Sequence, residues 1–413
     1  MSRDENTLGR YIIIAVIFLA AILTSIFITY KCSTNEGGSS SKRRGHSYAE
    51  SGDWYEEQGE TDKELYVDFT SSDVDLSKNY VVPNYIDYIV FSGVSYRVYE
   101  NFSILISPRS SRVEVEMRNF SYTAPSGKVA FDASGVSDNY KVYFTVEGMV
   151  KISGGCGNDG TSGMGYSATS STRTPRDGEE GTDGTDGAEA AKFNSVDIKI
   201  KDGAQLILIG GNGGNGGDGG QGEGSNAPGN PRAGTGGAGG SGGVGASAIV
   251  VKGDFEINNG GTFSAYGGVG GNGGNAGNGG TATVKYPTDR FDDGGYGGNG
   301  GNGGAGAPAV VAVKTDSMKI VGKQIDCVAG NGGNGGRGGN GGKTGKNIMG
   351  KGTPGDGGRG GNGGDGAIDS LVHNLVSVSG SDGGKGGTGG NAGTGDHVEG
   401  AYGRSGNGGR SFK

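Results

Sequence analysis

One loop of the chain gathers side chains that suit carbohydrate chemistry. Within the segment 281–293, the polar and aromatic members are Tyr286, Asp289, Arg290, Phe291, Asp292 and Asp293. Glycoside hydrolysis uses a pair of carboxylates, and aromatic rings and an arginine beside them could bind a sugar. A solvated acidic loop is the alternative, because carboxylates are common on surfaces and no second acid is fixed opposite the three aspartates. We therefore treat the six residues as candidates for ligand binding and predict no catalytic residue.

The glycine-rich sequence also contains partial matches to phosphate and metal motifs. Residues 337–344 approach a phosphate-binding loop, but Arg337 replaces its first glycine and no helix is predicted after it. Residues 360–368 approximate a calcium-binding nonapeptide, which works only in tandem, and Ala367 stands where a large apolar residue belongs. The histidines His46, His373 and His397 are too dispersed for a metal set or a catalytic triad. We thus predict no metal and no cofactor, and we find no positive support for an enzyme.

Charge and cysteine content exclude further classes of protein. The net charge is −8, so the chain lacks the basic face that nucleic-acid binding requires, and no nucleic-acid partner is predicted. The cysteines Cys32, Cys156 and Cys327 are too few and too far apart for a disulfide framework or a C-x-x-C metal site. Cys156 and Cys327 either form a disulfide outside the cell or remain buried thiols.

A glycine repeat supplies the frame that must position the loop 281–293. Residues 1–150 hold 10 of the 96 glycines, and the others follow in a register that is mostly Gly-Gly-X. In polyproline II geometry three residues complete a turn, so Gly-Gly-X leaves two edges without Cβ atoms and lets neighbouring helices hydrogen-bond through their backbones. The side chains at X are then expected to point to solvent. Flexible linkers or low-complexity tracts are the alternative interpretation.

The glycine-rich region 154–413 also repeats at about 60 residues, which favours order over a flexible linker. The alanines that introduce its β-rich patches, Ala188, Ala246, Ala307 and Ala367, are spaced by 58, 61 and 60 residues. Each patch contains two short strand-like runs, followed by an outgoing glycine run, an irregular loop and a returning glycine run. We predict about four stacked units, a solenoid of short strands and Gly-Gly-X helices.

Distinct segments precede this repeat. Residues 11–30 form an uncharged apolar stretch long enough to cross a bilayer, so we predict a transmembrane helix behind a short tail, residues 1–10. A cleaved signal peptide is the rival interpretation. Residues 31–64 are polar and charged, as in a disordered stalk. Residues 65–153 alternate β-branched or aromatic with polar residues, which predicts an all-β domain, either a sandwich or the opening coils of a solenoid.

The Gly-Gly-Asn triplets of residues 330–340 resemble the polyglycine II helix bundles of phage tail-tip adhesins, springtail antifreeze proteins and the extracellular glycine-rich region of anaplastic lymphoma kinase receptors. The strand-rich coils are similar to right-handed parallel β-helix surface proteins. The likeness covers about residues 154–409 and concerns composition and period, so no functional residue is carried over. It implies a glycine-rich surface protein whose fold is all-β plus polyglycine II.

Together these features predict a single-pass protein of the cell surface, with the lipid bilayer as a partner through residues 11–30. We expect the C-terminal body to lie outside the cell, because the ten-residue N-terminal tail is too short to perform a function there. The positive-inside count weakly favours the opposite orientation, but long domains translocate largely regardless of such charge.

The predicted function is that of a scaffold or adhesin. A rigid body would present loops to a carbohydrate or protein ligand, and these loops are residues 223–233, 281–293 and 343–354. Two alternatives stay open. One is a β-helix polysaccharide-active enzyme that uses Asp289, Asp292 or Asp293, and the other is a surface-coat protein without a specific ligand.

Overall fold

The computed structural model describes residues 63–69, 79–94, 97–167, 169–170, 174–226, 232–283, 293–314, 318–344, 353–367, 376–394 and 401–410. All of them belong to one compact unit, Gly52–Lys413. The predicted tail, the predicted transmembrane segment and residues 31–62 of the predicted stalk lie outside the described residues. The stalk was predicted to extend to residue 64, but Glu64 is the first residue of a strand, Glu64–Asp68.

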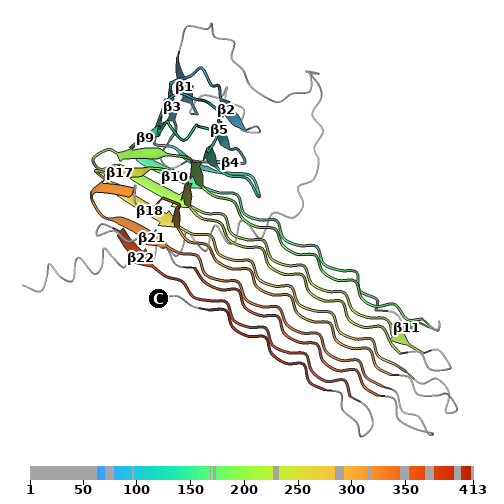
Figure 1. Cartoon of the computed structure of the whole chain (residues 1–413). Helices are drawn as coiled ribbons and strands as arrows, with labels where there is room; N and C mark the ends of the chain where they lie inside the picture. The colour runs from blue at the N-terminus through green and yellow to red at the C-terminus, as the bar shows by residue number, and fades with distance from the viewer. Residues whose placement is uncertain are drawn as a thin grey trace, which may run out of the picture. The chain divides into compact units, whose positions relative to one another are not determined.

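Parallel strands dominate this unit (Figure 1). Sheet A contains, in spatial order, β1 (Glu64–Asp68), β3 (Tyr88–Ser92), β6 (Val113–Arg118), β9 (Val142–Glu147), β13 (Val196–Ile200), β17 (Phe255–Asn259) and β20 (Met318–Gly322). Sheet B contains β2 (Tyr80–Val82), β5 (Ile104–Ile106), β8 (Phe131–Ala133), β12 (Ala191–Phe193), β16 (Ile249–Val251) and β19 (Val310–Ala312). Sheet C contains β4 (Val98–Glu100), β7 (Ser121–Thr123), β10 (Met149–Ser153), β14 (Gln205–Ile209), β18 (Thr262–Tyr266), β21 (Ile325–Val328) and β22 (Val376–Ser379). A short pair joins β11 (Thr169–Ser170) to β15 (Gly224–Ser225).

The chain winds through the three sheets in a constant order. Each coil supplies a strand to sheet B, then to sheet A, then to sheet C, as β8, β9 and β10 do, and the next coil repeats the order with β12, β13 and β14. In the early coils the connection from sheet C back to sheet B is short. From β10 onward a long glycine-rich excursion enters at this same corner, so the glycine runs are insertions into a parallel β-solenoid.

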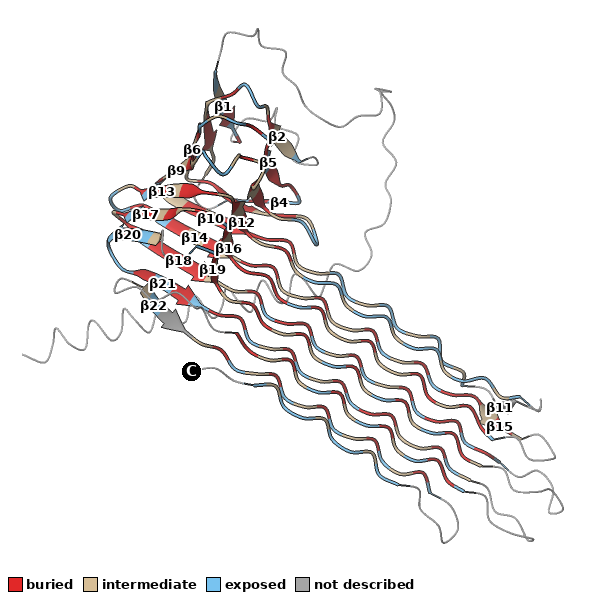
Figure 2. Cartoon of the chain, in the orientation of Figure 1, coloured by how far each residue is buried: buried red, intermediate tan, exposed pale blue. Residues whose placement is uncertain are grey.

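The apolar core lies between the three sheets. Alternate residues of each strand point inward, so that Val196, Ile198 and Ile200 of β13 are buried while Lys199 is exposed. Aromatic rings fill the first coils, and Phe120 packs against Phe69 with ring centroids 4.4 Å apart. Figure 2 shows the same burial continuing from the strands into the inner glycine runs.

These observations confirm an all-β fold but correct the predicted fold class. The described residues contain parallel strands, turns and extended segments and no helix, so the Gly-Gly-X runs are extended segments and not the predicted helices. No helix within the described part of the chain is long and apolar enough to span a bilayer. The predicted β-rich domain, residues 65–153, and the glycine-rich solenoid after it are one structure. Strand β9, before Gly154, pairs with β13, after it, in the same sheet.

Sequence periodicity missed this continuity for a physical reason. The sheet partners of β9 are β6, which is near in sequence, and β13, which lies beyond a glycine excursion. Because a strand's inward-outward alternation is the same in a sandwich and in a solenoid, the pattern of residues 65–153 did not distinguish them. The coils of that segment are the opening coils of the solenoid.

Candidate functional site

The glycine excursions form two layers of extended runs that leave the strand part side by side (Figure 1). The outgoing runs in the described chain are residues 154–166, 210–225, 267–282, 329–344 and 380–394. The returning runs are residues 176–188, 233–246, 293–307, 353–367 and 401–410. We call each outgoing run with its returning run a glycine coil, numbered first to fifth, and we call the ten runs the glycine body.

Each backbone donor of a Gly-Gly-X triplet has its own partner. In the second coil, the first glycine, Gly213, donates to the carbonyl of Val269 in the next outgoing run at 2.9 Å. The second glycine, Gly214, donates to the carbonyl of Thr185 in a returning run, also at 2.9 Å. The X residue, Asn215, donates to Oδ1 of Asp159 at 2.7 Å. The whole triplet is therefore satisfied within the body, as a buried backbone requires.

Close approach of the runs explains why both glycines are needed. A Cβ built on Gly213 would lie 2.0 Å from the carbonyl oxygen of Gly243, and one built on Gly214 would lie 2.0 Å from that of Asn158. Both contacts are with backbone, which cannot move aside as a side-chain tip can. Any larger residue must therefore separate the runs.

The side chains at X do more than face solvent, which corrects the sequence-based expectation. Asn and Asp at X accept a hydrogen bond from the backbone N–H of the X residue one coil later. One ladder of such contacts runs through Asp159, Asn215, Asn272, Asn334 and Lys385, with N to Oδ1 distances of 2.7, 2.9, 2.9 and 2.8 Å. Asn and Asp fit because each places a carbonyl or carboxylate oxygen a short distance from the backbone. The enrichment of Asn at X was the available signal, but its partner lies about 60 residues away.

We call the end of the glycine body that lies away from sheets A, B and C the loop end. There the runs hold the bases of successive loops in register. Ser225 forms a parallel bridge with Ala282, whose N–H donates to the carbonyl of Lys343 at 2.9 Å. On the returning side, the N–H of Thr353 donates to Oδ1 of Asp293 at 2.7 Å. The loops that begin and end at these residues therefore leave the body one coil apart.

The predicted binding residues separate into two groups. Tyr286, Asp289, Arg290, Phe291 and Asp292 lie outside the described residues. Asp293 is described, and its Oδ1 accepts hydrogen bonds from both the N–H and the hydroxyl of Thr353, at 2.7 and 2.6 Å. Asp293 therefore anchors the base of its loop to the next coil, a structural role that the acidic cluster did not indicate.

Two arginine–tyrosine stacks at the loop end were missed by sequence reasoning. The guanidinium carbon of Arg176 lies 4.0 Å from the ring centroid of Tyr166, and that of Arg232 lies 3.3 Å from the ring of Tyr296. Glu223 also binds Arg176, whose backbone N–H and side chain lower the pKa of the Glu223 carboxyl, in that order of importance. An aromatic residue at X in place of Asn, as at Tyr296, was the signal available in the sequence.

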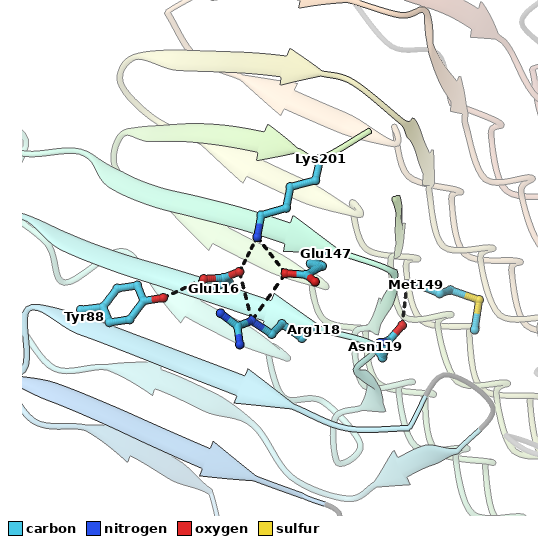
Figure 3. A network of polar contacts seen from close by, with 7 residues as sticks. All are labelled: Tyr88, Glu116, Arg118, Asn119, Glu147, Met149 and Lys201. Atoms are coloured by element: carbon cyan, nitrogen blue, oxygen red, sulfur yellow. Dashed lines mark hydrogen bonds and ion pairs between the residues drawn. The ribbon is translucent and has the colours of Figure 1, made fainter. Parts of the chain in front are cut away.

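A second polar cluster lies on the outer face of sheet A (Figure 3). Lys201 reaches Oε1 of Glu116 at 2.8 Å and Oε2 of Glu147 at 2.7 Å. Arg118 contacts Glu116 at 3.1 Å, and the hydroxyl of Tyr88 donates to Oε2 of Glu116 at 2.7 Å. The cluster joins β3, β6, β9 and the turn after β13, so it ties four consecutive coils together.

The pKa values of this cluster suit a structural role. Burial would raise the pKa of Glu116, but hydrogen bonds from Arg118, Lys201 and Tyr88 outweigh burial and lower the pKa to about 2. Burial, followed by the hydrogen bond to Glu116, raises the pKa of Tyr88 to about 12. Glu116 is thus held ionised and Tyr88 neutral, which leaves neither poised for proton transfer near pH 7.

Other polar sites among the described residues are modest. A hollow of about 750 Å³ beside the cluster is lined by Glu64, Asp87, Tyr88, Ser111, Arg112 and Glu114. No three His, Cys, Asp or Glu side chains of the described part lie close enough together to hold a metal ion. Cys327 is buried in β21.

Comparison with known proteins adds little to this geometry. No family model matches the chain, and no curated protein is similar to it. A solved structure, the nine polyproline type II helical bundle springtail antifreeze protein from Granisotoma rainieri, is 19% identical and covers 60% of this chain and 94% of its own, with a TM-score of 0.11. A TM-score this low does not establish a common fold, so no residue role is transferred from it.

Proposed function

We propose that this protein is a rigid scaffold that presents a row of loops at the loop end to a carbohydrate or protein ligand on another surface. The observation that carries the proposal is the hydrogen-bonded register of the loop bases, in which Ser225, Ala282 and Lys343 follow one another across three coils. Preorganised loops bind with less loss of conformational entropy than loops on a mobile stem. The location at a cell surface remains a prediction from residues 11–30.

The chemistry at the loop end supports a ligand rich in hydroxyl groups. The rings of Tyr166 and Tyr296 and the guanidinium groups of Arg176 and Arg232 flank the loops, and such groups combine apolar faces with directional donors. Ser225 Oγ and Asn226 Oδ1 are buried there without a hydrogen-bond partner among the described residues. Polar atoms of this kind favour contact with further polar groups.

Exchange of the loops tests the proposal. The segments 227–231, 284–292 and 345–352 would each be replaced by a Gly-Ser segment of equal length, and each variant would be tested against a glycan array and for adhesion to cells. We expect at least one exchange to weaken binding tenfold or more while the thermal unfolding temperature stays unchanged, because the loop bases are held by the body and not by the loops.

A matched exchange elsewhere serves as the control. The turn at Ser137, Asp138 and Asn139 lies in the strand part, and its replacement by Gly-Ser residues should leave binding unchanged. Binding that survives the exchange of all three loops would contradict the proposal. Release of shortened glycans from the array by the unaltered protein would instead support the enzymatic alternative.

A further inference from the structure

The two edges of the glycine body carry opposite charge. The first coil has the acidic residues Asp159, Asp177, Glu179, Glu180, Asp183 and Asp186 and one basic residue, Arg176. The second and third coils are nearly neutral. The described part of the fifth coil has Lys385, Arg404 and Arg410 against Asp382, and the fourth coil also has an excess of basic residues. The charge therefore changes sign from the first coil to the fifth.

Most of these charges form no ion pair with a described residue, although one oxygen each of Asp159, Asp177, Asp183 and Asp186 accepts a backbone N–H of the second coil at 2.6–2.7 Å. Glu179, Glu180 and Asp183 form no ion pair with any described residue, and neither do Arg404 and Lys385. Arg410 is an exception, because its Nη2 lies 2.8 Å from Oδ2 of Asp365. Figure 2 shows exposed residues along the outermost runs, whereas the glycines of the inner runs are buried or half-buried and exposed residues there occur mainly at X.

The backbone of each edge lacks the neighbour that the inner coils have. In the second coil the carbonyl of the X residue Thr235 accepts a hydrogen bond from Gly178 of the coil before it. The carbonyls of Glu180 and Asp183 occupy the same position in the first coil, which no glycine run precedes. The strand coils before Gly154 stack on the strand part alone, through pairs such as β9 with β13. Within the part of the chain that the structure describes, the first edge of the glycine body therefore has no neighbouring glycine run.

Side chains at both edges prevent another glycine run from joining by backbone contact. The first coil has Thr182 and Thr185 where inner coils have their second glycine, and their hydroxyls accept the N–H groups of Thr161 and Asn158 at 2.7 Å. The fifth coil has Ser405 where inner coils have their first glycine. Capping of this kind is how repeat proteins and sheets limit open-ended growth. Any partner of these edges must therefore bind through side chains.

We propose that the acidic edge of one copy binds the basic edge of a second copy through side-chain ion pairs. Both edges derive from one repeat, so Glu180, Asp183 and Asp186 recur every three residues on the acidic edge. Arg404, Asn407 and Arg410 recur at the same interval on the basic edge, where Asn407 is uncharged, Arg410 pairs with Asp365, and Arg404 carries the charge available to a second copy. Three residues of extended chain at about 3.1 Å each separate successive side chains by about 9 Å on both edges. The contact joins two different surfaces, so it extends into rows of copies rather than closing into a dimer.

A charge exchange on the full chain tests this proposal. Sedimentation velocity is expected to show rows of copies in 20 mM NaCl and single copies in 500 mM NaCl, because exposed ion pairs are screened by salt. The acid-edge variant Glu179→Lys/Glu180→Lys and the basic-edge variant Lys385→Glu/Arg404→Glu should each lose association by tenfold or more. A mixture of the two variants should associate again, because each then offers the charge that the other lacks.

The control keeps the charge change but moves it to the strand part, where Lys63→Glu/Arg112→Glu should leave association unaltered. Single copies of the unaltered chain at low salt would overturn the proposal, as would association that both edge variants retain. The loops are unchanged in these variants, so their ligand binding is a separate readout from the association of edges.

Discussion

Replacement of Gly271 by alanine is expected to open the glycine body around the third coil. A Cβ on Gly271 would lie 1.9 Å from the carbonyl oxygen of Gly214, and both atoms belong to runs that are hydrogen-bonded on several sides. The runs must separate, which breaks backbone hydrogen bonds worth about 1 kcal/mol each in addition to the steric cost of about 1–3 kcal/mol. We expect amide hydrogen exchange in residues 210–220 to accelerate by about a hundredfold.

Gly408→Ala is the matched control for this experiment. Gly408 lies in the same kind of triplet, but in the last returning run, and a Cβ on it would meet one atom, the carbonyl oxygen of Gly384 at 3.7 Å. That distance is ordinary contact, so the alanine should be neutral or slightly stabilising through its effect on the unfolded chain. Equal effects of the two substitutions would contradict the packing that we describe.

Loss of the Glu116 carboxylate is expected to produce the next largest effect. Depression of its pKa from 4.5 to about 2 corresponds to about 3 kcal/mol of stability at neutral pH. Because the folded pKa lies below the unfolded value, this stability is fully present above about pH 4.5 and is lost as the pH falls towards 2. Glu116→Gln should therefore unfold at lower denaturant concentration at pH 7 than the unaltered chain, and the difference should shrink between pH 4 and pH 2.5.

Tyr88 gives the cluster a second, alkaline boundary. Its folded pKa of about 12 lies above the ordinary value of 10.0, so its contribution to stability is present below pH 10 and is lost as the pH rises towards 12.

Glu114→Gln serves as the control for Glu116→Gln, since Glu114 lies on the same strand but pairs with Arg112 at an exposed site worth less than about 1 kcal/mol. If Glu116→Gln showed the same pH dependence of unfolding as the unaltered chain, the cluster would not be the acid-sensitive element.

Local sequence patterns predicted the features of this fold that depend on near neighbours. Alternation in segments such as 142–146 predicted strands, and the triplet register predicted runs that pack through glycine edges. What escaped prediction depends on partners about a coil apart. Asn215 contacts Asp159, and Lys201 contacts Glu116, across separations of 56 and 85 residues. A single sequence does not show which coil lies next to which.

The candidate site was less predictable than the fold. The aspartates of the loop 281–293 attracted a chemical interpretation because of their density, yet Asp293 acts as a loop anchor through Thr353. The stacks of Arg176 on Tyr166 and of Arg232 on Tyr296 carried no motif, since each joins residues on different runs or across a loop. Charge was more informative when assigned to coils than when counted over the whole chain.

Hydrogen exchange of the unaltered full chain tests the central claim, which is that the glycine body is an ordered scaffold. Glycine amides of the inner runs, such as Gly213, Gly214 and Gly271, donate to backbone carbonyls at 2.8–2.9 Å and should exchange slowly, with protection comparable to the strand amides of β13. The glycine amides of the last returning run, residues 401–410, should exchange faster than those of the inner runs. Exchange of the inner glycine amides at the rate of an unstructured chain would contradict the account and leave the loops on flexible linkers.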